Sequence, residues 1–214
     1  MNIGFIYRNH TSKWACAPLI VPKKGREGFR FTVDLRPVNA QTKKNLWAMP
    51  HADAMLARLK KAVIFFLLDF LYGYWQFPLA SLSQECQSFH TPFGVFSPTR
   101  VLHGSTNSVP YFQSSMDYMF AYLEVLIWLD DVLGFAKTYD ELLDILHQVL
   151  KICAAKGLKL NPNKCELVAK EVQFCGRIIG SKGVKFNPRN YNALITMPTP
   201  KTAGALMELV HGAN

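Results

Sequence analysis

Two adjacent carboxylates stand inside an apolar run of this sequence. Residues 127–135 read IWLDDVLGF, so Asp130 and Asp131 are flanked on both sides by side chains that favour burial. A third acid, Asp69, is the only charged residue of another apolar run, AVIFFLLDF (62–70). An ionised carboxylate is costly to bury and adjacent carboxylates repel each other, so these acids require compensating cations.

Divalent metal ions would provide that compensation. Carboxylate oxygens favour Mg²⁺ or Mn²⁺, and two such ions about 3.5–4 Å apart can activate an attacking hydroxyl and stabilise a leaving phosphate oxygen. If the three acids meet in space, they therefore predict phosphoryl or nucleotidyl transfer. The alternative is that Asp130 and Asp131 occupy a solvent-exposed turn, where Asp is a preferred residue.

The segments that carry the acids are predicted to be β-structure. Residues 62–70 are continuously apolar, which is typical of a strand buried on both faces. Residues 125–135 are apolar and β-prone on both sides of the paired acids, which predicts a hairpin with Asp130 and Asp131 at its tip. Pairing of the hairpin with the first strand would place the three acids at one edge of a sheet.

Helices and further strands complete a mixed pattern. Helical spacing is seen in residues 51–61, 107–123 and 138–157, where Thr138 and Glu141 form a capping box. Asn187 and Pro188 predict the start of a last helix. A hairpin with a basic loop is expected in 19–33, and short strands in 165–169, 171–179 and 183–186. This order predicts an α+β fold with antiparallel pairing, as a layer of helices behind one sheet.

Composition narrows the function classes. The 214 residues are 50% hydrophobic, enough for a sizeable core. The net charge of +9 is concentrated in residues 1–61, which hold 12 of the 24 Lys and Arg but 3 of the 15 Asp and Glu. That excess could attract a polyanion such as nucleic acid, or could be a solvated basic face.

Cysteine usage and hydropathy exclude other classes. The five cysteines are scattered without a C-x-x-C pair, which favours neither a disulfide framework nor a zinc site and fits a reducing, intracellular compartment. Residues 62–79 are the best candidate for a membrane span. However, a central Asp costs about 3 kcal/mol on insertion, and Gly73, Gln76 and Pro78 interrupt the run, so no membrane association is expected. The first residues lack the pattern of a secretory signal.

Six segments, in order, resemble the motifs of one known family. The family is the reverse transcriptases of long-terminal-repeat retrotransposons, most closely the gypsy-like group, and the resemblance runs from about Lys13 to Asn214. The segments are FRFTVDLRPVNAQT (29–42), FLLDFLYGYWQFPL (66–79), FGVFSPTRVLHGSTNSVPYFQ (93–113), WLDD (128–131), GLKLNPNKCELV (157–168) and EVQFCGRIIGSKGVKFNP (171–188).

The resemblance implies roles for particular residues. Asp69, Asp130 and Asp131 would hold two Mg²⁺ (or Mn²⁺) ions, with the backbone carbonyl of Phe70 as a further ligand. The nucleophile would be the 3′-hydroxyl of a primer. The remaining positions are a triphosphate clamp of Arg30 with Lys23 or Lys24, a ribose-contacting Tyr74, a template- and nucleotide-contacting His103, and a primer grip of Phe174, Cys175 and Gly176.

The resemblance also implies a domain plan. The fold would be a right-hand polymerase of fingers and palm, with an antiparallel palm sheet backed by helices. Residues 1–61 would form fingers and 62–186 the palm, with an interleaved fingers segment at about 80–105 and the primer-grip hairpin. Residues 187–214 would begin a truncated thumb, where relatives continue into further domains.

The function implied is that of an RNA-directed DNA polymerase core. Its partners would be an RNA or DNA template with its primer, deoxynucleoside triphosphates (dNTPs), and protease, RNase H and integrase segments of the same element. A cytoplasmic particle and the nucleus remain open as locations. Departures from the family pattern, among them Trp128 in place of Tyr and His103 in place of Gln or an apolar residue, keep an alternative open: a degenerate fragment that only binds nucleic acid. A two-metal nuclease would require further acids and a His or Lys base near Asp69.

Overall fold

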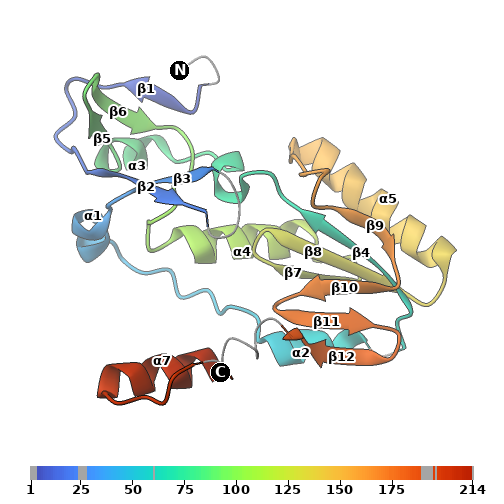
Figure 1. The fold of residues 1–214 in the computed structure, drawn as a ribbon. Helices are drawn as coiled ribbons and strands as arrows, with labels where there is room; N and C mark the ends of the chain where they lie inside the picture. Colours follow the sequence, from blue (N-terminus) through green and yellow to red (C-terminus); the bar gives the residue numbers. More distant parts are fainter. Residues whose placement is uncertain (1–3, 24–27, 60, 189–194, 196, 214) are drawn as a thin grey trace.

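The structure is a computed structural model that describes residues 4–23, 28–59, 61–188, 195 and 197–213. Its centre is a four-stranded antiparallel sheet in the order β7-β8-β4-β9 (Figure 1). The strands are β4 (Ile64–Asp69), β7 (Val125–Trp128), β8 (Asp131–Ala136) and β9 (Glu166–Ala169).

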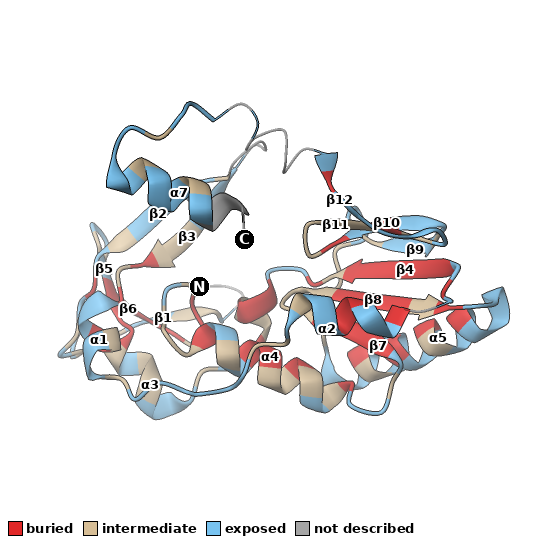
Figure 2. Ribbon diagram, turned by 90° about the horizontal axis from the view of Figure 1, so that it is seen from below, coloured by how far each residue is buried: buried red, intermediate tan, exposed pale blue. Residues whose placement is uncertain are grey.

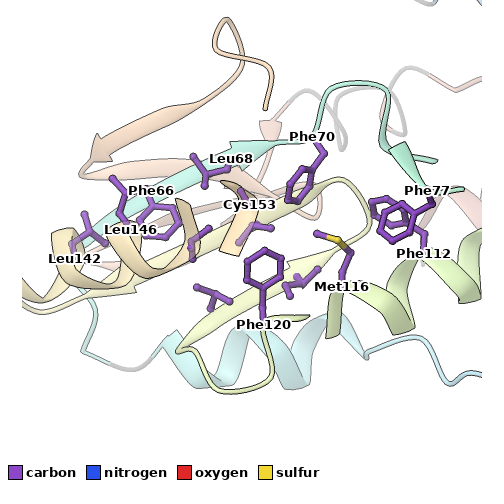
Figure 3. Packing of buried hydrophobic residues seen from close by; sticks show 14 of the residues in the cluster. Phe66, Leu68, Phe70, Phe77, Phe112, Met116, Phe120, Leu142, Leu146 and Cys153 are labelled. Carbon is purple, nitrogen blue, oxygen red and sulfur yellow. The ribbon is translucent and has the colours of Figure 1, made fainter. Parts of the chain in front are cut away.

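Strand β4 is buried on both faces because its side chains alternate between two cores. Phe66 and Leu68 join α4 (Ser108–Met119) and α5 (Tyr139–Lys156) in the first core, part of which is drawn in Figure 3. Phe65 and Leu67 face the second core, built with α2 (Ala52–Leu56) and a 3₁₀ turn (Ala57–Leu59). This double burial explains why the strand is apolar without alternation.

A second sheet contributes the rest of the second core. It is a three-stranded meander of β10 (Glu171–Phe174), β11 (Arg177–Gly180) and β12 (Gly183–Phe186). Val172, Phe174 and Ile179 are buried against the sheet that holds β4. The cation of Arg177 lies 3.8 Å from the ring centre of Phe186, bracing the outer strand.

The N-terminal part forms two small sheets around a third core. One sheet has the order β1-β6-β5, with β1 (Ile6–Arg8), β5 (Phe89–Thr91) and β6 (Gly94–Pro98). The other is the hairpin of β2 (Pro18–Pro22) and β3 (Phe29–Val33), followed by α1 (Arg36–Gln41). α3 (Ser81–Cys86) precedes β5, and α7 (Ala203–Ala213) lies apart from the main body (Figure 1).

Burial is uneven over these parts. Figure 2 shows β4 and β8 almost wholly buried, whereas β2 and α7 are largely exposed. All five cysteines are free thiols. Among the described residues no helix is both long enough and apolar enough to cross a membrane, and residues 64–69 of the run considered for that role are strand β4.

The α+β class with antiparallel sheets is confirmed, but the expected single sheet is wrong. Over the described residues the strands are divided among four sheets, because the buried apolar residues form three separate clusters. The helix expected over 51–61 ends in a 3₁₀ turn at Leu59, and the one expected over 107–123 ends at Met119. The run 171–179 is two strands joined by a turn at Cys175–Gly176. The helix expected from Asn187 falls largely outside the described residues.

Candidate active site

The three acids meet at one end of the central sheet. In the register of β4 with β8, Asp69 lies directly opposite Asp131, and such partners have Cα atoms about 4.5–5.5 Å apart. Asp130 occupies the two-residue turn between β7 and β8, and its carbonyl accepts a hydrogen bond from the Phe70 N–H at 2.9 Å. The predicted convergence of residues 69, 130 and 131 is therefore confirmed.

The turn itself is strained. Leu129 has φ 53°, in the left-handed region that costs a residue with a Cβ about 1–3 kcal/mol. Its N–H donates to Gln113 Oε1 at 2.9 Å, which holds the turn in place. Gly73 lies beside the turn, where an added Cβ would be 3.4 Å from Asp130 Cγ. The backbone of Gly73 therefore lies in contact range of this carboxylate.

Burial and mutual repulsion disfavour the charged forms of two acids. Desolvation, followed by repulsion from Asp69 and Asp130, raises the pKa of Asp131 to about 6. Desolvation and then Asp69 raise the pKa of Asp130 as well. Lys164 offsets part of this charge because its Nζ lies 2.7 Å from Asp69 Oδ2. The site thus has more negative charge than its own cation neutralises.

This donor set fits a hard divalent cation, although the side chains are not gathered into a ready cage. In the part of the chain that the structure describes, no group of three or more His, Cys, Asp or Glu residues could hold a metal ion as it stands. Lys164 instead engages Asp69. Two backbone hydrogen bonds join residues 69–71 to residues 159–161. The Leu71 N–H donates one and the Asp69 carbonyl accepts the other, so neither uses the carbonyl of Phe70. Carboxylates with raised pKa values and a nearby carbonyl suit Mg²⁺ or Mn²⁺.

Aromatic residues line the side of the turn that faces Gly73. Tyr74 is 8% exposed, with its ring 4.7 Å from that of His103 and 5.2 Å from that of Phe112. Burial, followed by repulsion from Asp130, raises the pKa of Tyr74 to about 12. Burial lowers the pKa of His103, against the opposing attraction of Asp130. Both rings therefore stand uncharged beside a carboxylate.

The β2–β3 hairpin is attached to the same region through His103. Thr32 Oγ1 donates to the His103 carbonyl at 2.8 Å, and a Cβ on Gly104 would lie 2.8 Å from the Val33 carbonyl oxygen. Only glycine, with φ 105° here, permits this approach. Arg30 lies near enough to His103 to lower its pKa further, so the hairpin brings a cation towards the turn.

Of the other predicted cations, Lys23 lies at the end of β2, where its N–H donates to the Gly28 carbonyl at 3.1 Å. Lys24 lies outside the described residues. The hairpin therefore carries an exposed Arg30 and a half-buried Lys23.

A cavity of about 620 Å³ opens on the other side of the acids. Cys175 and Gly176, predicted for the primer grip, line it together with Asp69 and Asp131. Phe174 does not line this cavity, because it is 1% exposed and packs in the second core. Burial and then Asp131 raise the pKa of Cys175 to about 12, so its thiol stays protonated.

The sequence motifs did not single out two residues that the structure brings to the site. Lys164 pairs with Asp69 across 95 positions, and Gln113 supports the turn from 16 positions away. A signal was present for Lys164, since it is a cation in the turn that follows Asn161 and Pro162, two residues before β9 begins. For Gln113 the only signal was its position on the buried side of an amphipathic helix. A buried amide needs hydrogen-bond partners, so an amide side chain at such a position is uncommon.

Comparisons with known proteins agree with this geometry. Residues 21–179 match the family described as reverse transcriptase (RNA-dependent DNA polymerase). The chain is 30% identical over 207 residues to the retrovirus-related Pol polyprotein from transposon 297 of Drosophila melanogaster, covering 94% of this chain and 20% of that protein. It is 27% identical over 204 residues to the transposon Tf2-3 polyprotein of Schizosaccharomyces pombe, covering 94% of this chain and 15% of that protein.

Solved structures show the same fold. A foamy viral protease-reverse transcriptase in complex with double-stranded DNA superposes with a TM-score of 0.91 at 23% identity, covering 99% of this chain and 37% of that one. The foamy viral protein in complex with an RNA/DNA hybrid gives a TM-score of 0.84 at 23% identity, covering 98% of this chain and 28% of that one. The chain thus spans well under half the length of each of these relatives.

Proposed function

This chain belongs to the reverse transcriptase (RNA-dependent DNA polymerase) family, and from that membership we propose that it is the nucleotidyl-transfer core of an RNA-directed DNA polymerase. The reaction would join a dNTP to the 3′-hydroxyl of a primer paired with an RNA or DNA template. The observation that carries this proposal is the register of Asp69 opposite Asp131, with Asp130 in the adjoining turn.

Asp69, Asp130 and Asp131, with the carbonyl of Phe70, would hold two Mg²⁺ or Mn²⁺ ions. When bound, such ions activate the attacking hydroxyl and stabilise charge on the leaving phosphate oxygen. The raised pKa of Asp131 supports this assignment, since it arises first from burial and then from repulsion by Asp69 and Asp130, both of which a bound cation would offset. Lys164 would have to release Asp69 Oδ2 for a cation to bind at that oxygen.

The remaining residues would bind and orient the substrates. Arg30 and Lys23, with Lys24 of the same loop, would clamp the triphosphate, where fixed cations stabilise charge that grows during transfer. The buried ring of Tyr74 would exclude a ribose 2′-hydroxyl, with His103 packed against it. The turn of Cys175 and Gly176, supported from below by Phe174, would position the primer end.

This proposal extends to the domain plan. Residues 1–61 would be fingers and 62–186 palm, with 80–105 returning to the fingers; the third core, which joins Cys16, Val33 and Val38 to Phe89 and Phe96, supports that return. Residues 187–214 would begin the thumb. The element would be a gypsy-like retrotransposon, whose reading frame would also encode protease, RNase H and integrase segments.

The test is primer extension on an RNA template with Mg²⁺ and dNTPs. Asp130→Asn should lower the extension rate at least about 100-fold, because it removes a charged ligand at the reacting centre. Asp144→Asn, which removes an exposed carboxylate from α5, serves as the matched control and should extend normally. Equal rates for the two variants would refute the proposed function.

A further inference from the structure

A buried amide joins the carboxylate turn to helix α4. Gln113 is fully buried on α4, and its Oε1 accepts the Leu129 N–H at 2.9 Å. Its Nε2 donates to the Ile127 carbonyl at 3.1 Å, at the end of β7. One side chain thereby holds both the strand before the turn and the strained residue that precedes Asp130.

The network continues from Gln113 to the surface. Gln113 Nε2 also donates to Asp117 Oδ1 at 2.9 Å, one helical turn along α4. The second oxygen, Asp117 Oδ2, accepts the indole N–H of Trp47 at 3.1 Å. Every polar atom of the Gln113 amide is thus engaged, and the orientation of the amide depends on Asp117, whose carboxylate is itself held by Trp47.

Trp47 belongs to a surface segment with a second attachment to the same helix. Residues 43–47 run alongside α4 between α1 and α2 (Figure 1). Asn107, at the start of α4, accepts the Asn45 N–H at 2.9 Å and donates to the Lys43 carbonyl at 2.9 Å. The segment is otherwise exposed, including both lysines and Leu46, which is 90% exposed.

We propose that Gln113 and Asp117 are positioning residues for Asp130, and that Trp47 couples the exposed segment 43–47 to the carboxylate turn. This inference rests on the proposed function and deepens it by naming what holds one metal-binding carboxylate in place. A left-handed residue with a Cβ, such as Leu129, keeps its conformation only where its surroundings hold it. A displacement near 1 Å at a reacting centre costs about 100-fold in rate.

The test compares Trp47→Phe and Asp117→Asn with a matched control, Tyr118→Phe. Trp47→Phe removes the indole donor and keeps an aromatic ring, whereas Tyr118 is 84% exposed, adjoins Asp117 and is outside the network. We expect kcat for single-nucleotide extension to fall roughly 5- to 10-fold in Trp47→Phe and further in Asp117→Asn. The KM for dNTP should change less than about 2-fold, because the nucleotide-facing residues are untouched. Tyr118→Phe should match the parent chain.

A second readout does not depend on activity. Hydrogen exchange of the Leu129 amide should be several-fold faster in Trp47→Phe and Asp117→Asn than in the parent and in Tyr118→Phe, because the bond to Gln113 Oε1 protects it. If the parent chain extends no primer, the proposed function fails. The exchange rate of the Leu129 amide then tests by itself whether Trp47 and Asp117 hold the turn. Unchanged exchange in both variants overturns the inference, and so does faster exchange with unchanged kcat in an active parent chain.

Discussion

Asp131 is a carboxylate whose surroundings favour the protonated form. Its pKa is raised to about 6, first by burial and then by Asp69 and Asp130. An acid with a higher pKa in the folded state than in the unfolded state binds its proton more tightly when folded, so stability is lost as the pH rises from about 4 towards 6. We expect the metal-free chain to show a falling melting temperature over this window, and Mg²⁺ to restore it at pH 7.

Thermal melts in a chelator, with and without excess Mg²⁺, measure this effect. Asp131→Asn supplies the control because its amide has no charge to lose, so its pH slope between 4 and 6 should be flatter. If the melting temperature of both chains changes equally with pH between 4 and 6, groups other than Asp131 cause the change.

Tyr74 makes the second prediction at the scale of one side chain. Its buried ring stands between His103 and Phe112, beside Asp130, where the sugar of an incoming nucleotide would lie in the proposed function. Tyr74→Ala should raise the preference for ribonucleotides over deoxynucleotides by about 10-fold or more, since a pocket that rejects a hydroxyl sterically loses that power when the ring is gone. Tyr74→Phe should keep the parent preference.

Single-nucleotide extension with each nucleotide type gives the ratio of kcat/KM values. Because the ratio is taken within one variant, any loss of folded protein cancels. An unchanged ratio in Tyr74→Ala would remove this residue from sugar selection.

At the scale of elements, β8 has no room for a side chain at Gly134, which its apolar sequence pattern does not indicate. Gly134 lies beneath the ring of Phe66 on β4, and an added Cβ would fall 2.0 Å from Phe66 Cζ. Gly134→Ala should therefore destabilise the fold by about 1–3 kcal/mol, since Phe66 is fully buried and has no room to move. Gly204→Ala in α7 meets no atom within 4 Å and should be neutral or slightly stabilising.

Chemical denaturation of the two alanine variants measures the difference. Equal stability of Gly134→Ala and the parent would mean that the Phe66 ring can move without cost, contrary to its close packing in the first core (Figure 3).

The helices differ in how far they are specified locally. α5 begins at a complete capping box of Thr138 and Glu141 and ends at the left-handed Gly157, so its limits are encoded by adjacent residues. α4 has no side-chain cap at Asn107, because the amide of Asn107 binds the backbone of residues 43–45 instead. Asn107 could have capped the start of α4, but its side chain instead joins α4 to residues 43–45.

At the scale of the whole molecule, the fold brings the basic part of the chain to the acids. Residues 1–61 carry the excess of Lys and Arg, while the three carboxylates belong to the remainder. The contact of Thr32 and Val33 with residues 103 and 104 attaches the β2–β3 hairpin beside the turn of Asp130. Cations and carboxylates far apart in sequence thereby face one region, which suits a polyanionic substrate held by metal ions.

The sequence by itself determined the strongest local features and the centre of the site. The hairpin with acids at its tip, the doubly buried strand ending in Asp69 and the capped helix α5 follow from hydrophobic pattern, turn residues and caps, all of which act between near neighbours. The convergence of the three acids was predictable because two apolar strands with one charged end each have few ways to pair.

Only the tertiary structure decided how these parts are divided and supported. Several features depend on contacts between residues that are distant in the sequence. They are the division of the described strands among four sheets, the burial of Phe174 next to the turn of Cys175 and Gly176, and the pairing of Lys164 with Asp69. The hydrogen-bond path from Trp47 through Asp117 and Gln113 to Leu129 is another. Such contacts are selected by the packing of whole faces against each other. Composition and periodicity describe each face but do not specify its partner.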